Sequence, residues 1–335
     1  MALIIPKNYS DVLDGRTTES AIKFVKDTFE RELTEKMNLS RVSAPLFVRP
    51  ETGLNDNLNG VERPVSFDAP CIGGAVIEVV HSLAKWKRMT LGKYSFGPGE
   101  GLYTDMNAIR RDEEVDNLHS MYVDQWDWEA VINKEDRTVD TLKNTVKKIY
   151  AAMRSAQTKV CEKYKDLKNY FPEEIKFITT QELEDMYPDD KPKERENKYL
   201  RENGAACIMQ IGKILNSGEP HDGRAPDYDD WELNADIVVY YPVLDCALEL
   251  SSMGIRVDEN SLMTQLKEAG CLDRLELDFH KMIINKELPY TIGGGIGQSR
   301  ICMIMLNKAH VGEVQQSVWP EDMLDICRKN GMNIL

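Results

Sequence analysis

The chain has 335 residues, of which 42% are hydrophobic, and a formal net charge of −14 at pH 7. This length suits one large domain or two ordinary ones, and the apolar fraction is sufficient for a core without disulfides. The acidic balance argues against extended contact with nucleic acid, whose phosphates need a basic protein face, but it leaves room for a small nucleotide site.

Seven cysteines are spread along the chain without a CxxC pair. This usage is typical of free thiols in a reducing compartment and argues against a disulfide framework or a cysteine metal site. The N-terminal apolar run is too short for a secretory signal, and no stretch approaches the length of a membrane span. We therefore expect a cytoplasmic protein without membrane contact.

The first predicted element is a long amphipathic helix that follows a turn at Asp14-Gly15. Thr17 or Thr18 is expected to cap it, and apolar residues recur at helical spacing up to about Met37. Next, residues 41–48 predict a strand interrupted by a proline, which is typical of a sheet edge or an interface.

The following segments predict short strands and loops in alternation. In chain order they are a polar loop over 51–64, a strand within 71–80, the start of a helix at 81–88, a glycine-rich loop over 96–101, a strand over 102–109 and a charged connection over 110–117.

The side chains of residues 119–129 fall into two sets when every second residue is taken together, which predicts a half-buried strand with two different faces. One face carries Gln125 and Asp127, and the other carries Trp126 and Trp128. The polar face is a candidate wall of a binding site, and simple solvent exposure is the alternative.

The second half predicts a mixture of helices and strands that do not alternate regularly. The expected elements are a long amphipathic helix over 142–164, a charged surface stretch over 185–197, a strand over 204–215, an acidic loop over 219–230, two further strands and a helical region over about 260–286. This order favours an α+β fold with an antiparallel sheet.

Four glycines in five positions, within residues 293–297, predict a loop rather than a strand or helix interior. Glycine permits positive φ and the close approach of a ligand. A helix is expected to follow directly, with Arg300 in its first turn. Because a helix start already favours an anion, a cation there suggests a phosphate partner, and a solvent-facing arginine is the alternative. Neither the dinucleotide fingerprint nor a P-loop fits this stretch.

A β-rich run over 236–241 and its continuation over 244–250 predict a hairpin. If Pro242 and Val243 form a two-residue turn, Asp236 lies opposite Glu249, with Cβ atoms about 5 Å apart. Two carboxylates in that arrangement need a cation between them, and Mg²⁺ takes one or two carboxylates together with substrate phosphates. The alternative is that the pair never meets.

The chain resembles the ammonia-dependent asparagine synthetases (aspartate–ammonia ligases), relatives of the class II aspartyl- and asparaginyl-tRNA synthetase catalytic domain. The resemblance covers nearly the whole chain, and its most specific segments are His81–Arg88, Gly99–Thr104, Tyr122–Glu129, Ala225–Trp231, Glu249–Arg256 and the glycine-rich stretch. It implies one class II synthetase-like catalytic domain over residues 1–335, an antiparallel sheet flanked by helices, and a homodimer built on the first helix and the strand around Pro45.

The resemblance also implies the reaction: ATP-dependent amidation of L-aspartate by ammonia to L-asparagine, through a β-aspartyl-adenylate, with release of AMP and pyrophosphate. Mg²⁺ is implied at Asp236 and Glu249. The implied nucleotide site places Arg110 on the α-phosphate and Arg300 at the γ-phosphate end, and its full set is Arg110, Ser120, Asp229, Gly294, Gly295, Gly297 and Arg300. By strand alternation Ser120 faces away from Gln125, so a bulge or a backbone contact is needed there.

The implied aspartate site consists of Asp56, Ser82, Lys87, Gln125, Asp127, Ser252 and Arg256. Carboxylates in this set suit the substrate ammonium, and Asp56 is implied to bind or deprotonate ammonium, whereas the cations suit substrate carboxylates. Without the resemblance, Lys87 reads as part of a basic, solvated helix face with Lys85 and Arg88. Two alternative functions are an aminoacyl-tRNA synthetase-like enzyme that activates an α-carboxylate and a non-catalytic protein that binds an amino acid or nucleotide.

Overall fold

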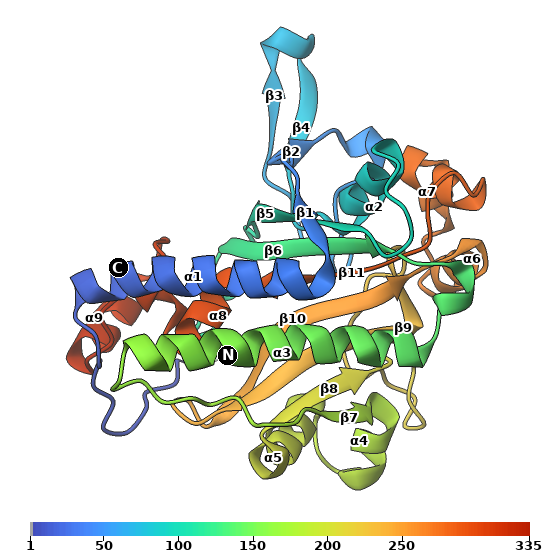
Figure 1. Cartoon of the computed structure of the whole chain (residues 1–335). Coiled ribbons are helices and arrows are strands. Elements are labelled where there is room, and N and C mark those ends of the chain that lie inside the picture. Colours follow the sequence, from blue (N-terminus) through green and yellow to red (C-terminus); the bar gives the residue numbers. More distant parts are fainter. Residues whose placement is uncertain (1–2) are drawn as a thin grey trace.

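An eight-stranded sheet forms the centre of the molecule in the computed structural model, which describes residues 3–335 (Figure 1). Its strand order is β1 (Leu39–Arg41), β5 (Gly101–Ile109), β6 (Tyr122–Val131), β11 (Thr291–Gly297), β10 (Cys246–Arg256), β9 (Asp229–Tyr241), β8 (Ala205–Met209) and β7 (Lys176–Thr179). Neighbours from β5 to β8 are antiparallel, and only the outer pairs β1–β5 and β7–β8 are parallel. The α+β prediction is confirmed.

Two long helices, α1 (Gly15–Met37) and α3 (Val139–Lys163), run side by side across one face of the sheet (Figure 1). The short helix α8 (Gln298–Met305) is also buried there. Phe29 of α1 packs on Trp126 of β6, with ring centroids 4.7 Å apart. The first helix ends at Met37 as predicted, but Asp14 is its cap and accepts a hydrogen bond from the Thr17 amide.

The opposite face of the sheet is covered by α2 (Ala84–Lys93), α6 (Glu259–Glu268) and α7 (Asp278–Ile284). A separate three-stranded sheet projects beyond them, in the order β2 (Phe47–Val48), β4 (Ala75–Val79) and β3 (Ser66–Ala69) (Figure 1). The predicted strand over 41–48 is therefore split between two sheets, on either side of Pro45.

Three helices were missed by the sequence patterns. They are α4 (Thr180–Met186), α5 (Pro192–Asn203), which occupies much of the stretch expected to be charged surface, and α9 (Glu321–Lys329) near the C-terminus. The strand expected over 204–215 is confined to the five residues of β8. Within residues 3–335, no helix combines the length and apolar character needed to cross a membrane.

The glycine-rich stretch is a central strand, β11, and not a loop, so that prediction is wrong. None of its glycines has a positive φ. Their small size is what the fold uses: a Cβ built on Gly293 would lie 1.9 Å from Glu129 Oε2, and one on Gly295 would lie 2.3 Å from Gln125 Oε1. Glycine lets long polar side chains of β6 lie across the strand.

Replacing Gly294 by alanine is expected to lower the free energy of unfolding by about 1–3 kcal/mol. A Cβ there would lie 2.5 Å from the Ser252 carbonyl oxygen and 2.6 Å from Met253 Cβ, so the backbone of two strands must shift. Urea denaturation measures the change. Gly15→Ala is the matched control, because a Cβ at Gly15 has nothing within 4 Å. Equal stability of the two variants would show that the sheet absorbs the added methyl group.

Candidate active site

A polar cavity of about 480 Å³ opens on the sheet face that carries α2. Its walls come from β6, β10 and β11 and from three loops, over 56–62, 110–120 and 222–228. This volume lies in the range of small-molecule sites. Of the sixteen residues expected in the site, fifteen line the cavity, and Asp236 is the exception.

Asp56 lies at one end of the cavity, in the loop before β3, and is 3% exposed. Its carboxylate accepts hydrogen bonds from Ser82 Oγ at 2.8 Å and Tyr228 OH at 3.2 Å. Asn55 holds this loop, because its side-chain oxygen accepts from the His81 amide at 2.9 Å. The prediction that Asp56 and Ser82 share one site is consistent with this geometry, and Tyr228 joins them.

Lys87 is completely buried, so a solvated helix face is the wrong description. Its ammonium contacts the Asp127 carboxylate and donates to the carbonyls of Trp128 and Gly294, each at 2.9 Å. Burial lowers the pKa of Lys87 and raises that of Asp127, and their mutual contact opposes both shifts. The neighbouring Lys85 and Arg88 are buried too.

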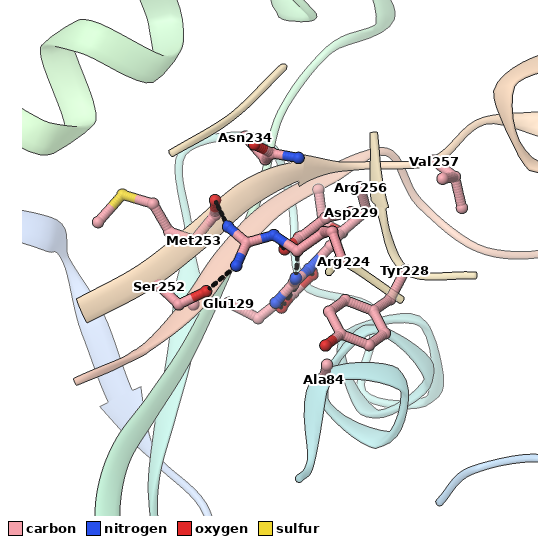
Figure 2. A network of polar contacts seen from close by, with 12 residues as sticks. Ala84, Glu129, Arg224, Tyr228, Asp229, Asn234, Ser252, Met253, Arg256 and Val257 are labelled. Carbon is pink, nitrogen blue, oxygen red and sulfur yellow. Dashed lines mark hydrogen bonds and ion pairs between the residues drawn. The ribbon is translucent and has the colours of Figure 1, made fainter. Parts of the chain in front are cut away.

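Arg256, at the end of β10, is held between two carboxylates (Figure 2). It donates to Glu129 Oε2 from Nη2 at 2.7 Å and bonds Asp229 through Nη1. Burial opposes its charged form, but these two carboxylates outweigh burial and raise the pKa of Arg256. Asp229, expected near the nucleotide, lines the cavity but is ion-paired with Arg256 and lies 3.3 Å from Arg224 Nε.

The other end of the cavity holds two arginines. In the part of the chain that the structure describes, the Arg110 side chain has no hydrogen bond or ion pair, and its Nε is buried. Arg300 Nη1 donates to the Glu249 carbonyl at 3.0 Å, and its Nε lies 3.4 Å from the Leu118 carbonyl. An unpaired guanidinium in a cavity favours an anionic ligand.

Ser120 also lines the cavity, and its hydroxyl donates to Ser317 Oγ at 2.9 Å. The expected conflict with Gln125 does not arise, because β6 begins at Tyr122 and strand alternation does not extend to Ser120. Gly294, Gly295 and Gly297 also line the cavity.

The predicted hairpin register is wrong. β9 and β10 are joined by the four residues 242–245, Asp236 lies opposite Ser252, and Glu249 lies opposite Val238. The two carboxylates are therefore diagonal neighbours on one face of the sheet. Asp236 accepts from Arg224 Nη2 at 2.9 Å, outside the cavity lining, whereas Glu249 lines the cavity.

This pair suits a hard cation in ligand type and charge. Burial raises the pKa of Asp236 to about 7, with Arg224 opposing and Glu249 adding to the shift. Residues 3–335 contain no cluster of three or more His, Cys, Asp or Glu side chains able to hold a metal. Two carboxylates are a donor set that fits Mg²⁺ when the ion also binds substrate phosphates.

Among the cavity residues that the sequence patterns did not single out are Arg224 and Tyr228. Tyr228 lies inside the segment 225–231, which was recognised only for its family resemblance, and Arg224 directly precedes that segment. Neither has a local pattern of its own, because their partners are distant in sequence: Arg224 bonds Ser252 and Asp236 on two strands, and Tyr228 bonds Asp56 in the loop before β3.

Known proteins of one family match the whole chain. The profile of the aspartate-ammonia ligase family matches residues 16–331. Aspartate–ammonia ligase of Ruminiclostridium cellulolyticum is 65% identical over 100% of this chain and 99% of its own length. The Clostridium tetani protein of the same name is 62% identical, over 99% of this chain and 98% of its own length.

Solved structures share the fold at low identity. Asparaginyl-tRNA synthetase of Pyrococcus horikoshii, complexed with asparaginyl-adenylate, has a TM-score of 0.64 and 15% identity, over 91% of this chain and 71% of its own. Aspartyl-tRNA synthetase of Entamoeba histolytica has a TM-score of 0.60 and 16% identity, over 90% and 58%. The fold is that of a class II synthetase catalytic domain, and by its full-length matches the chain belongs to the aspartate–ammonia ligase family.

Proposed function

We propose that this aspartate–ammonia ligase family member forms L-asparagine from L-aspartate and ammonia, cleaving ATP to AMP and pyrophosphate through a β-aspartyl-adenylate. One observation carries the proposal: a single cavity has two arginines at one end and a buried set of carboxylates and cations at the other. Such a cavity suits a triphosphate beside a small dicarboxylic amino acid. Two solved neighbours that share the fold are complexed with asparaginyl-adenylate, which is an aminoacyl-adenylate like the proposed intermediate.

The nucleotide lies at the arginine end. Arg110, whose guanidinium has no partner among the described residues, binds the α-phosphate, and Arg300 binds the γ-phosphate end. Ser120, Gly294, Gly295 and Gly297 form the surface beside it. Both arginines stabilise the negative charge that develops as the α-phosphorus is attacked, so catalysis is mainly positioning and electrostatics.

Aspartate lies at the other end. Gln125 and Asp127 face its α-ammonium, and the buried cation Arg256 attracts its α-carboxylate. Lys87, whose three donors are bonded within the protein, contributes its positive charge to the same end. Asp229 and Glu129 hold Arg256 in place. Asp56, with Ser82 bonded to its carboxylate, accepts a proton from ammonium at the same end of the cavity.

When bound, Mg²⁺ would be held by Glu249 and Asp236 and would neutralise phosphate charge. We further propose a single catalytic domain that acts as a homodimer in the cytoplasm. The family's dimer motif corresponds to α1 and the strands around Pro45, and exposed apolar side chains are present there, with Phe47 46% and Phe67 45% exposed.

Aspartate-dependent exchange of pyrophosphate into ATP tests the proposal. The purified protein with Mg²⁺, ATP and aspartate is expected to exchange label without ammonia. With hydroxylamine in place of ammonia, the product is expected to be the β-hydroxamate of aspartate. An absence of exchange would end the adenylate proposal, while an α-hydroxamate or charging of tRNA would favour the synthetase-like alternative.

A further inference from the structure

Arg224 is the most highly connected cation of the cavity that the proposed reaction does not yet use. It lies in the loop before β9, lines the cavity, and its side chain is 9% exposed. Its guanidinium donates to Ser252 Oγ at 2.5 Å and to the Met253 carbonyl at 3.4 Å (Figure 2). It also donates to Asp236 Oδ1 at 2.9 Å.

The guanidinium retains donors for a ligand. Arginine carries five N–H groups, and the hydrogen bonds found among residues 3–335 use three of them. Its Nε is buried without a hydrogen bond, although Asp229 Oδ2 lies 3.3 Å away. By contrast, the three N–H groups of Lys87 all donate within the protein, to one carboxylate and two carbonyls. A buried N–H group without an acceptor lowers the stability of the protein, unless a ligand in the cavity accepts its hydrogen bond.

Arg224 also lies between the two ends of the cavity. Its partner Ser252 belongs to the aspartate end, and Glu249, three residues earlier on β10, contacts Arg300 at the nucleotide end. The carboxylate carbon and the α-phosphorus must meet at this boundary.

We propose that Arg224 is a catalytic residue that donates hydrogen bonds to the β-carboxylate of aspartate and then to the acyl oxygen of the adenylate. This inference rests on the proposed function. In the first step a β-carboxylate oxygen forms a bond to the α-phosphorus, and the bond to pyrophosphate breaks. In the second step the nitrogen of ammonia attacks the acyl carbon, the carbon–oxygen bond to AMP breaks with its electron pair on AMP, and one proton leaves the nitrogen for solvent. Arg224 offsets the charge on the acyl oxygen during this attack, as an oxyanion-hole donor does.

The competing description is that Arg224 only joins Asp229 to Asp236. The test compares Arg224→Gln with wild type for pyrophosphate exchange, for asparagine formation and for the KM of each substrate. We expect kcat to fall by about 10²–10³ in both assays, with the KM for ATP changed by no more than about threefold. A purely structural role predicts loss of folded protein, with a near-normal kcat for each remaining active molecule.

Arg195→Gln is the matched control, because Arg195 is also a buried arginine, 3.3 Å from Glu184 and 3.2 Å from the Tyr187 carbonyl, but lies outside the cavity lining. It is expected to lose stability while keeping kcat. If Arg224→Gln does not fold, Arg224→Lys is the variant to measure. Lysine retains the positive charge but lacks the paired N–H donors of the guanidinium, so kcat should still fall at least tenfold. A kcat within threefold of wild type in the variant that folds would overturn the role of Arg224. Absence of exchange in the wild type would instead overturn the proposed function.

Discussion

Replacing Arg110 by alanine is expected to lower turnover by about 10²–10³, as loss of one fixed charge at a reacting centre does. The fold should be unaffected, because the Arg110 side chain makes no hydrogen bond or ion pair with the residues that the structure describes. Most stabilising roles of a cation are thereby excluded, and its place in the cavity leaves an anionic ligand as its partner. Steady-state kinetics of asparagine formation measure the turnover, and urea denaturation measures the free energy of unfolding.

The comparison needs an arginine with a similar charge and no role in the cavity. Arg328 on α9 is suitable, since its side chain is 77% exposed and its one ion pair among residues 3–335 is with Asp325, at 3.0 Å. Arg328→Ala is expected to match wild type in turnover. Equal turnover of the Arg110 and Arg328 variants would remove Arg110 from the nucleotide site and leave its unpaired guanidinium without a function.

The spacing of apolar residues and the residue types were sufficient to predict the helices and strands that form the frame of the site. The stripe that ends at Met37, the alternation that puts Trp126 and Asp127 on opposite faces, and the helix that contains Arg300 are all present. These patterns depend on burial of one face, and burial is encoded locally by the spacing of apolar residues.

The glycine-rich strand shows what local propensity cannot predict. A run of glycines is a poor strand former by itself, because it lacks side chains to pack and loses more conformational entropy on folding. Here β11 pairs with β6 and β10 on both sides, and polar side chains from those strands occupy the space that a Cβ would need. The reason for glycine lies in residues about 40 to 170 positions away.

The predicted register of the two carboxylates was wrong for a different reason. Asp236 and Glu249 were correctly placed on adjacent strands, but a four-residue connection and an irregularity after Glu249 moved them from opposite to diagonal positions. Turn length and bulges set the register, and the sequence around Pro242 does not specify them uniquely. The buried cation Arg224, which now accompanies Asp236, was missed because its partners lie on separate strands.

Glu249→Gln is expected to abolish measurable turnover while leaving the protein at least as stable as wild type. Glu249 lines the cavity, lies 3.8 Å from Arg300 through Oε1, and adds to the raised pKa of the half-buried Asp236. An amide of the same shape removes the charge that would hold Mg²⁺ and also removes repulsion between the two carboxylates. Turnover measured over a Mg²⁺ titration, together with urea denaturation, separates these effects.

The control for this substitution is Glu174→Gln, because the Glu174 side chain is 78% exposed and lies outside the cavity lining. It should keep full turnover at every Mg²⁺ concentration. If excess Mg²⁺ restores the Glu249 variant to wild-type turnover, the carboxylate contributes affinity for the ion but not chemistry. Full activity of that variant at ordinary Mg²⁺ would exclude Glu249 as a ligand, and Asp236, already paired with Arg224, could not hold the ion alone.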